Sequence, residues 1–286
     1  RRWDPLPPMP TARSHCTAAV LDGVIYVLGG LGGKLTDPSP LPLLAACERF
    51  HPTCRVWERL PSMGTPRRSC GAVPAMGALY AVGGMIQDSA KGTFTLAPCP
   101  TESLCPETLS WKPVPKMIVM QGECIAAPVG GKIYAAARIM QAHALWMCIR
   151  FDPVADRLER VPPMGTQIAR HALAGVEVAG KFCVVGDSGG LLGCFDPAKG
   201  AWEVLRPKLG LGPVFFECPA AAAADGRLFV LGGRVLKSTE EGGTAASSLQ
   251  FGNSSWEPLP PLPIPRAHTA VTTVTVSNMP QAVTSA

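Results

Sequence analysis

The stretch IYVLGG, residues 25–30, decides how this chain folds. Its β-branched, aromatic and leucine residues favour a buried strand. The strand then ends on two glycines, which a chain needs where φ is positive or where backbone segments approach closely. The doublet is either half of a phosphate-binding loop or part of a repeated turn, and recurrence along the chain separates these two interpretations.

The stretch recurs at a regular spacing. Two close copies are LYAVGG at 79–84 and LFVLGG at 228–233, and two weaker copies are IYAAAR at 133–138 and FCVVGD at 182–187. The first doublet position falls at residues 29, 83, 137, 186 and 232, so the steps are 54, 54, 49 and 46 residues. Tryptophans follow the same period, at Trp3, Trp57, Trp111, Trp202 and Trp256. Leu158 stands where one further tryptophan is expected. The chain is therefore a series of repeats.

Each repeat is predicted to form four short strands. In the first repeat, residues 16–21 and 24–28 form two strands, and Asp22-Gly23 supplies the tight turn between them. Turns of the same kind recur at Gly130-Gly131, Ala179-Gly180 and Asp225-Gly226. A fourth strand carries the tryptophan, and a third ends at a Phe-x-Pro marker, found at 50–52, 151–153 and 195–197. Four-stranded sheets that repeat in this way are typical of propeller blades.

These recurring residues make the chain similar to the kelch-repeat family over nearly its whole length. The likeness rests on the glycine doublets, the aromatic residues before them and the spaced tryptophans: Gly29-Gly30, Gly83-Gly84, Gly232-Gly233, Tyr26, Tyr80, Trp57, Trp111, Trp202 and Trp256. It implies an all-β kelch β-propeller with four-stranded antiparallel blades. Ala137-Arg138 and Gly186-Asp187 replace the doublet in repeats three and four, so we expect those two blades to be the irregular ones.

The two ends of the chain are predicted to complete one further blade. Arg2-Trp3-Asp4 reads as a fourth strand, and residues 266–276 read as a first strand. A closing blade shared by both termini gives a six-bladed propeller that forms a single domain over residues 1–286. Such closure is favourable because it removes open strand edges. The predicted blades are 11–60, 65–114, 119–161, 166–205, 214–259, and 262–286 together with 1–8. No doublet follows near residue 282, and we expect the natural protein to have residues upstream of Arg1.

Composition agrees with such a fold. The chain has 286 residues, of which 47% are apolar and 16% charged, and its 30 glycines and 30 prolines suit many short strands and turns. It lacks an apolar run of about 18 residues, so we expect no membrane span. The eleven cysteines are an odd number in a long chain. We therefore expect reduced core thiols in a cytosolic or nuclear protein, among them Cys16, Cys124, Cys183 and Cys194.

Catalytic and metal-binding interpretations find little support. The stretch at 28–35 has Leu28 and Leu35 where a phosphate-binding loop needs a glycine and a hydroxyl residue. Some kelch-like propellers are copper enzymes that use tyrosines, but the three tyrosines here share one repeat position, which packing explains. With no Cys-x-x-Cys pair in the chain, we expect no metal, no cofactor and no enzyme, and a metal-dependent kelch-like enzyme is the least favoured function.

Basic residues gather in the loops where propellers vary. In a four-stranded meander, the linker before each first strand and the connection after each second strand emerge on the same face. The repeat offsets align four linker arginines, at Arg13, Arg67, Arg170 and Arg266. Further candidates for this face are Arg68, Arg138, Arg234, His15 and His268. Guanidinium groups hold carboxylates in paired hydrogen bonds, so these residues predict a mouth that binds an acidic peptide or loop, unless each arginine pairs with a neighbouring acid or carbonyl.

The resemblance implies a protein-binding module. Kelch propellers of BTB-kelch proteins recruit targets to cullin-RING ubiquitin ligases, which makes a ligase adaptor the leading hypothesis, with ligase components bound through a region absent from these residues. Binding of actin or the cytoskeleton through blade edges is the alternative. We expect no nucleic acid and no membrane partner, because aromatic residues make up only 6% of the chain and leave no stacking platform. The expected location is the cytoplasm or the nucleus.

Overall fold

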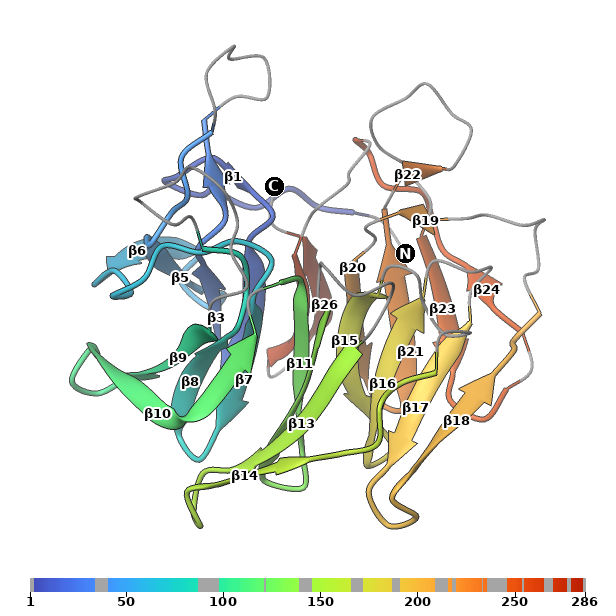
Figure 1. The fold of residues 1–286 in the computed structure, drawn as a ribbon. Coiled ribbons are helices and arrows are strands. Elements are labelled where there is room, and N and C mark those ends of the chain that lie inside the picture. Colours follow the sequence, from blue (N-terminus) through green and yellow to red (C-terminus); the bar gives the residue numbers. More distant parts are fainter. Residues whose placement is uncertain are drawn as a thin grey trace.

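The computed structural model describes residues 3–33, 41–86, 98–120, 122–138, 146–165, 172–186, 191–208, 216–217, 220–232, 234–235, 246–253, 255–264, 270–276 and 279–284. Five four-stranded antiparallel sheets follow one another along the chain and stand side by side around a ring (Figure 1). No helix among these residues has the length and hydropathy of a membrane span.

Every four-stranded sheet keeps its strands in chain order. The first contains β2 (Thr17–Leu21), β3 (Val24–Leu28), β5 (Cys47–His51) and β6 (Val56–Leu60). The second contains β7 (Gly71–Ala75), β8 (Ala78–Val82), β9 (Pro98–Cys105) and β10 (Ser110–Met120). The third contains β11 (Cys124–Val129), β12 (Lys132–Arg138), β13 (Trp146–Asp152) and β14 (Arg157–Arg160). The fourth contains β15 (Ala172–Val178), β16 (Lys181–Gly186), β17 (Leu192–Asp196) and β18 (Ala201–Leu205), and the fifth contains β20 (Ala220–Ala224), β21 (Arg227–Leu231), β23 (Ala246–Gln250) and β24 (Glu257–Pro258).

The first strands of the sheets form a closed inner ring. Neighbours in contact around it are β2, β7, β11, β15, β20 and β25 (Val271–Val276), and β25 in turn contacts β2. Within the described chain, β25 pairs only with β26 (Met279–Thr284), in a two-stranded sheet. The ring thus has six positions, and the prediction of four-stranded blades is confirmed at five of them.

The N-terminal segment enters the sixth position without forming the predicted strand. Residues 3–9 form no strand, so the fourth strand expected around Trp3 is not found among the described residues, whereas β25 lies within the first strand predicted at 266–276. Trp3 nevertheless packs against a core cluster that includes Leu262 and Val271, and its indole Nε1 donates to the carbonyl of Pro260 at 3.0 Å. The same bond joins other tryptophans to prolines of the preceding linker: Trp57 to Pro7 at 2.8 Å, Trp111 to Pro61 at 2.9 Å and Trp202 to Pro162 at 2.8 Å.

The hairpin between the first two strands uses the same turn in five blades. Asp22 and Gly23 both have positive φ, at 51° and 74°, which suits the twist of a two-residue hairpin. The predicted turns at Gly130-Gly131, Ala179-Gly180 and Asp225-Gly226 are confirmed, and Met76-Gly77 forms the turn of the second blade.

Loss of the glycine doublet does not disturb the third blade, contrary to expectation. Without glycines, β12 continues to Arg138 and pairs along its length with β13 without a register break. The fourth blade has one register shift, between Ala172 and Ala174, and the second blade has another, between Pro113 and Ile118. Substituting Ala137 and Arg138 for the doublet therefore extends a strand and leaves the pairing regular.

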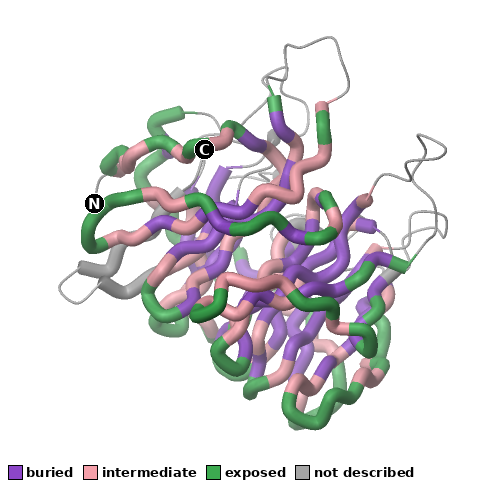
Figure 2. Tube along the Cα trace, turned by 90° about the vertical axis from the view of Figure 1, so that its left-hand side faces the viewer, coloured by how far each residue is buried: buried purple, intermediate pink, exposed green. Residues whose placement is uncertain are grey.

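The core lies between successive blades, and the turns at the ring surface are exposed (Figure 2). One cluster joins Tyr134 and Trp146 of the third blade to Phe182 and Phe195 of the fourth. The rings of Tyr134 and Phe195 lie 5.8 Å apart in a tilted arrangement that aromatic pairs favour. Each blade thus needs its neighbour to bury its apolar face.

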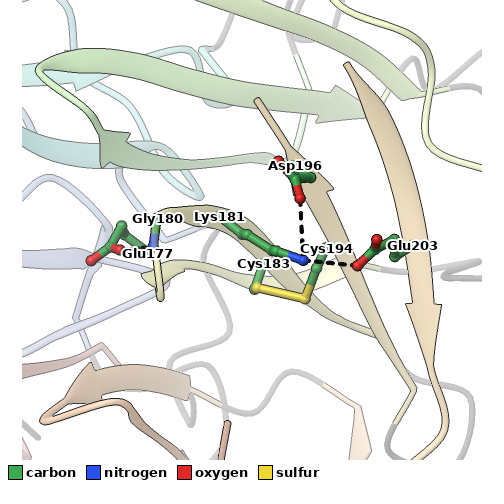
Figure 3. The surroundings of a disulfide bond; sticks show 7 residues. All are labelled: Glu177, Gly180, Lys181, Cys183, Cys194, Asp196 and Glu203. Atoms are coloured by element: carbon green, nitrogen blue, oxygen red, sulfur yellow. Dashed lines mark hydrogen bonds and ion pairs between the residues drawn. A yellow bond between two sulfur atoms is a disulfide. The ribbon is translucent and has the colours of Figure 1, made fainter. Parts of the chain in front are cut away.

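Two of the cysteines predicted to be reduced form a disulfide bond (Figure 3). Cys183 and Cys194 are directly opposed on β16 and β17, with their Cα atoms 4.1 Å apart. The prediction is wrong for this pair because strand register, which spacing along the chain does not reveal, brings the two side chains together. Cys16 and Cys124 remain free thiols, as expected.

Candidate functional site

The linker before the first strand of a blade pairs with the connection after its second strand. These are the two kinds of loop that were predicted to lie on the same face. β1 (Arg13–Ser14) pairs with β4 (Leu31–Gly32), and β19 (Phe216–Glu217) pairs with β22 (Arg234–Val235), at the upper end of the ring in Figure 1. In the second blade, the backbones of Arg68 and Met85 exchange hydrogen bonds of 3.1 and 2.8 Å. We call this paired-loop end of the ring the mouth.

The glycine doublets bring these loops together. Gly29 and Gly30 have φ of 60° and 106°, and a Cβ on Gly29 would lie 2.4 Å from the carbonyl oxygen of Arg67 in the next linker. A Cβ on Gly30 would lie 2.5 Å from the carbonyl oxygen of Ser14. The amide of Gly30 donates to the Arg67 carbonyl at 2.9 Å. Close backbone approach explains the doublet, which answers the question that the first strand raised.

Arg13 is buried beneath the mouth of the first blade. Its Nη1 donates to the carbonyls of Gly29 and Ala46, at 2.9 and 2.8 Å. Its Nη2 lies 3.1 Å from the carboxylate of Glu48, and Thr11 donates its hydroxyl to that carboxylate at 2.6 Å. The side chains of Arg13 and Glu48 are 0% and 1% exposed.

Arg67 repeats this arrangement in the second blade. Its Nη1 donates to the carbonyls of Gly83 and Pro100, at 3.0 and 2.7 Å, and its Nη2 donates to Glu102 at 2.6 Å. The backbone amide of Thr65 also donates to this carboxylate, at 3.1 Å. The guanidinium therefore links the glycine doublet, the third strand and the incoming linker of one blade.

These contacts correct the predicted role of two residues. Arg13 and Arg67 were expected to line an open mouth, but both guanidinium groups are buried and paired with acids and carbonyls of their own blade. They hold the loops in place and do not face a partner. A signal for this existed in the sequence, because a Thr-x-Arg segment precedes a glutamate by the same interval in both repeats, at Arg13 and Glu48 and at Arg67 and Glu102.

A partly exposed charged group lies where the second and third blades meet at the mouth. Arg138 Nη1 is 3.5 Å from the carboxylate of Glu123, with side chains 21% and 33% exposed. The same carboxylate interacts electrostatically with Arg68. Partial burial lowers the pKa of Arg68, and the negative charge of Glu123 raises it. We call Arg68, Glu123 and Arg138 the charged triad.

The other predicted mouth residues contribute less to the described structure. His15 has a positive φ of 54°, and its carbonyl accepts a 2.9 Å bond from the amide of Ser69 in the next blade. Its Nδ1 lies 3.1 Å from the hydroxyl of Ser14. Arg234 lies in β22, and its side chain is outside the described part of the chain. Arg170, Arg266 and His268 fall outside the described residues.

The described residues do not form a metal-binding site. They contain no group of three histidine, cysteine, aspartate or glutamate side chains that could hold an ion. Burial raises the pKa of the Cys16 thiol to about 11 and that of the Cys70 thiol to about 12, so these thiols, which directly precede β2 and β7, stay protonated at neutral pH.

A cleft of about 530 Å³ lies on the outer side of the second blade. Trp111 and Glu102 line it, but the indole of Trp111 already donates to Pro61 and the Glu102 carboxylate accepts from Arg67 and two backbone amides. Since these polar groups are satisfied within the blade, the mouth is the better candidate for a binding site.

Comparison with known proteins agrees with this architecture. The Kelch motif model matches residues 12–64, which is the first blade. An F-box/kelch-repeat protein of Arabidopsis thaliana is 27% identical over 135 residues, covering 47% of this chain and 34% of that protein. Kelch domain-containing protein 8B of Homo sapiens is 34% identical over 97 residues, covering 33% of this chain and 26% of that protein. Kelch-like protein 23 of Homo sapiens is 24% identical over 172 residues, covering 59% of this chain and 28% of that protein.

The chain thus spans about a third or less of the length of these relatives. The solved structure of YjhT has the same fold, with a TM-score of 0.70 and 16% identity over 98% of this chain and 95% of that one. Kelch repeats indicate a propeller that serves protein–protein interaction. The first blade matches the Kelch motif, and the recurring doublets and tryptophans together with the shared fold make the chain similar to kelch-repeat propellers.

Proposed function

We propose that this propeller recognises the substrate of a cullin-RING ubiquitin ligase and holds an acidic peptide or loop of that substrate at the mouth. The observation that carries the binding role is the charged triad, because its side chains are partly exposed and the Glu123 carboxylate, 3.5 Å from the Arg138 guanidinium, also acts electrostatically on Arg68. Such a group has a net positive charge and attracts a carboxylate.

The backbone around the triad supports binding, because it is held in place before a partner arrives. Arg68 is bonded to Met85, the amide of Gly122 donates to the Gly84 carbonyl at 3.2 Å, and the amide of Arg138 donates to the Glu123 carbonyl at 2.9 Å. A rigid site loses little conformational entropy on binding.

The ligase part of the proposal draws on the relatives. One is named as an F-box/kelch-repeat protein and another as kelch-like. The chain also resembles the propellers of BTB-kelch proteins, which recruit targets to these ligases. In this proposal the ligase is bound through a part of the polypeptide outside residues 1–286.

The test uses the full polypeptide in cells, as the wild type, as R68A/R138A and as K208A. Lys208 is an exposed lysine outside the mouth and serves as a control for lost charge. We expect wild type and K208A to co-purify with a cullin and the same target protein, and R68A/R138A to keep the cullin and lose the target. Co-purification of the target with all three proteins would overturn the mouth as binding site, and absence of any cullin would overturn the ligase role.

A further inference from the structure

The charged triad contains one acid, Glu123, beside two arginines. Glu123 directly precedes β11 and is positioned by its backbone, since its carbonyl accepts the amide of Arg138 at 2.9 Å. Its carboxylate lies 3.5 Å from the Arg138 guanidinium and interacts with Arg68. Its negative charge therefore faces guanidinium groups that an incoming carboxylate would also use.

Burial distinguishes this acid from those of the first two blades. The acids paired with Arg13 and Arg67 are buried, and each also accepts a hydrogen bond from a hydroxyl or an amide of the incoming linker. Glu123 is 33% exposed on its side chain. Water and solutes can thus reach the Glu123 pair, and a partly exposed pair exchanges partners at little cost.

We propose that Glu123 is the residue that sets the affinity and charge selectivity of the mouth, by competing with the carboxylates of an acidic peptide for Arg68 and Arg138. This inference rests on the proposed binding of an acidic peptide at the mouth. The competing carboxylate weakens the binding of every anion. A ligand with one carboxylate therefore binds poorly, whereas a ligand with several closely spaced carboxylates engages both arginines. The mouth accordingly selects runs of acidic residues over isolated ones.

The experiment measures the affinity of a fluorescein-labelled hexaglutamate peptide, with hexaglutamine as the neutral probe. Glu123→Gln keeps the shape of the side chain and removes its charge. The matched control is Glu177→Gln, which changes net charge equally but lies near the end of β15, where the Glu177 carboxylate accepts the amide of Gly180 at 2.8 Å (Figure 3). We expect E123Q to bind hexaglutamate about tenfold more tightly than wild type, and E177Q to bind as wild type does.

Further variants locate the effect. Adding Arg68→Ala or Arg138→Ala to E123Q is expected to abolish the gain, and raising the salt concentration is expected to shrink it, because exposed charges are screened. Thermal melting of E123Q checks that the fold is intact.

Two outcomes separate this inference from the function on which it rests. Equal hexaglutamate affinities of E123Q, E177Q and wild type, together with loss of binding in R68A/R138A, would overturn the role of Glu123 and leave the mouth as a binding site. Equal binding of hexaglutamate and hexaglutamine by the wild type would overturn both.

Discussion

Trp3 donates its indole N–H to the carbonyl of Pro260, 257 residues away in the chain, at 3.0 Å. Three other tryptophans make this bond to a proline of the linker that precedes their own blade. Trp3 therefore occupies the fourth-strand tryptophan position of the sixth blade, although the residues around it form no strand. The bond joins the two ends of the chain at the point where the ring closes.

Deletion of residues 1–10 should lower the melting temperature. The deletion removes the Trp3 bond and the Pro7 carbonyl that accepts from Trp57, and it uncovers the face of the first blade on which Leu6 and Met9 pack. Thermal unfolding followed by circular dichroism should show a decrease of about 5–10 °C, since a domain of this size loses roughly 2–4 °C per kcal/mol. Trp3→Phe keeps an aromatic side chain and removes the N–H donor, so its melting temperature should lie between those of the wild type and the truncated protein. If the truncated chain has the same melting temperature as the wild type, Trp3 does not close the ring.

Arg67→Ala should destabilise the fold strongly. The substitution leaves the buried carboxylate of Glu102 without its cation, and removal of one partner of a buried ion pair costs about 3–5 kcal/mol. Urea unfolding should show this loss in the free energy of unfolding, and Arg68→Ala, its neighbour at the mouth, should lose less than about 1 kcal/mol. R67M/E102L should recover part of the stability, because it removes both charges. Equal stability of R67A and R68A would place the Arg67 guanidinium in solvent.

Cys105 should be the most readily alkylated of the described thiols. Hydrogen bonds from the Thr108 hydroxyl and from the backbone amides of Thr108 and Glu107 lower the pKa of this thiol, whereas burial raises the pKa of Cys148 to about 11. Because the thiolate is the nucleophile, the labelling rate of Cys105 should rise with pH and reach its plateau at a lower pH than that of an ordinary cysteine. Iodoacetamide labelling at several pH values, followed by peptide mass spectrometry, measures this. Thr108→Val should shift the plateau to higher pH, and an unchanged profile would contradict the stabilising role of the turn.

The disulfide between Cys183 and Cys194 should survive purification without reductant. Proteolysis of the unreduced protein should release the peptides of β16 and β17 as a linked pair, and reductant should separate them. The double variant C183A/C194A should lose about 2–3 kcal/mol of stability, because a cross-link over a short loop restricts the unfolded chain. The control is Cys148→Ala, a buried free thiol of the third blade. Separate peptides from a protein prepared without reductant would contradict the bond.

The sequence predicts the repeating parts of this fold well, because they depend on local chemistry. Glycines are required where the backbone passes within van der Waals distance of the next linker, and the two-residue hairpins need positive φ, so both leave a visible pattern. Four of the five periodic tryptophans, Trp3, Trp57, Trp111 and Trp202, recur where the indole bonds to a linker proline. Five complete blades and the paired mouth loops follow from these signals.

Contacts between residues far apart in the chain leave no local pattern in the sequence. The burial of Arg13 and Arg67 depends on glutamates of a third strand, and those arginines look like loop residues when they are considered alone. Strand register decides that Cys183 faces Cys194. The competing role of Glu123 depends on the position of Arg138 in a neighbouring strand, which no local pattern at residue 123 reveals.

The most direct test of the mouth as a binding site is a titration of hexaglutamate against four single variants. We expect Arg68→Ala and Arg138→Ala each to weaken binding about ten- to a hundredfold, since a charge-assisted hydrogen bond contributes roughly 1.5–3 kcal/mol. Lys208→Ala should bind as wild type does. Glu123→Gln should bind more tightly. Equal affinities for all four variants would contradict the account and move the binding site from the mouth to the blade edges.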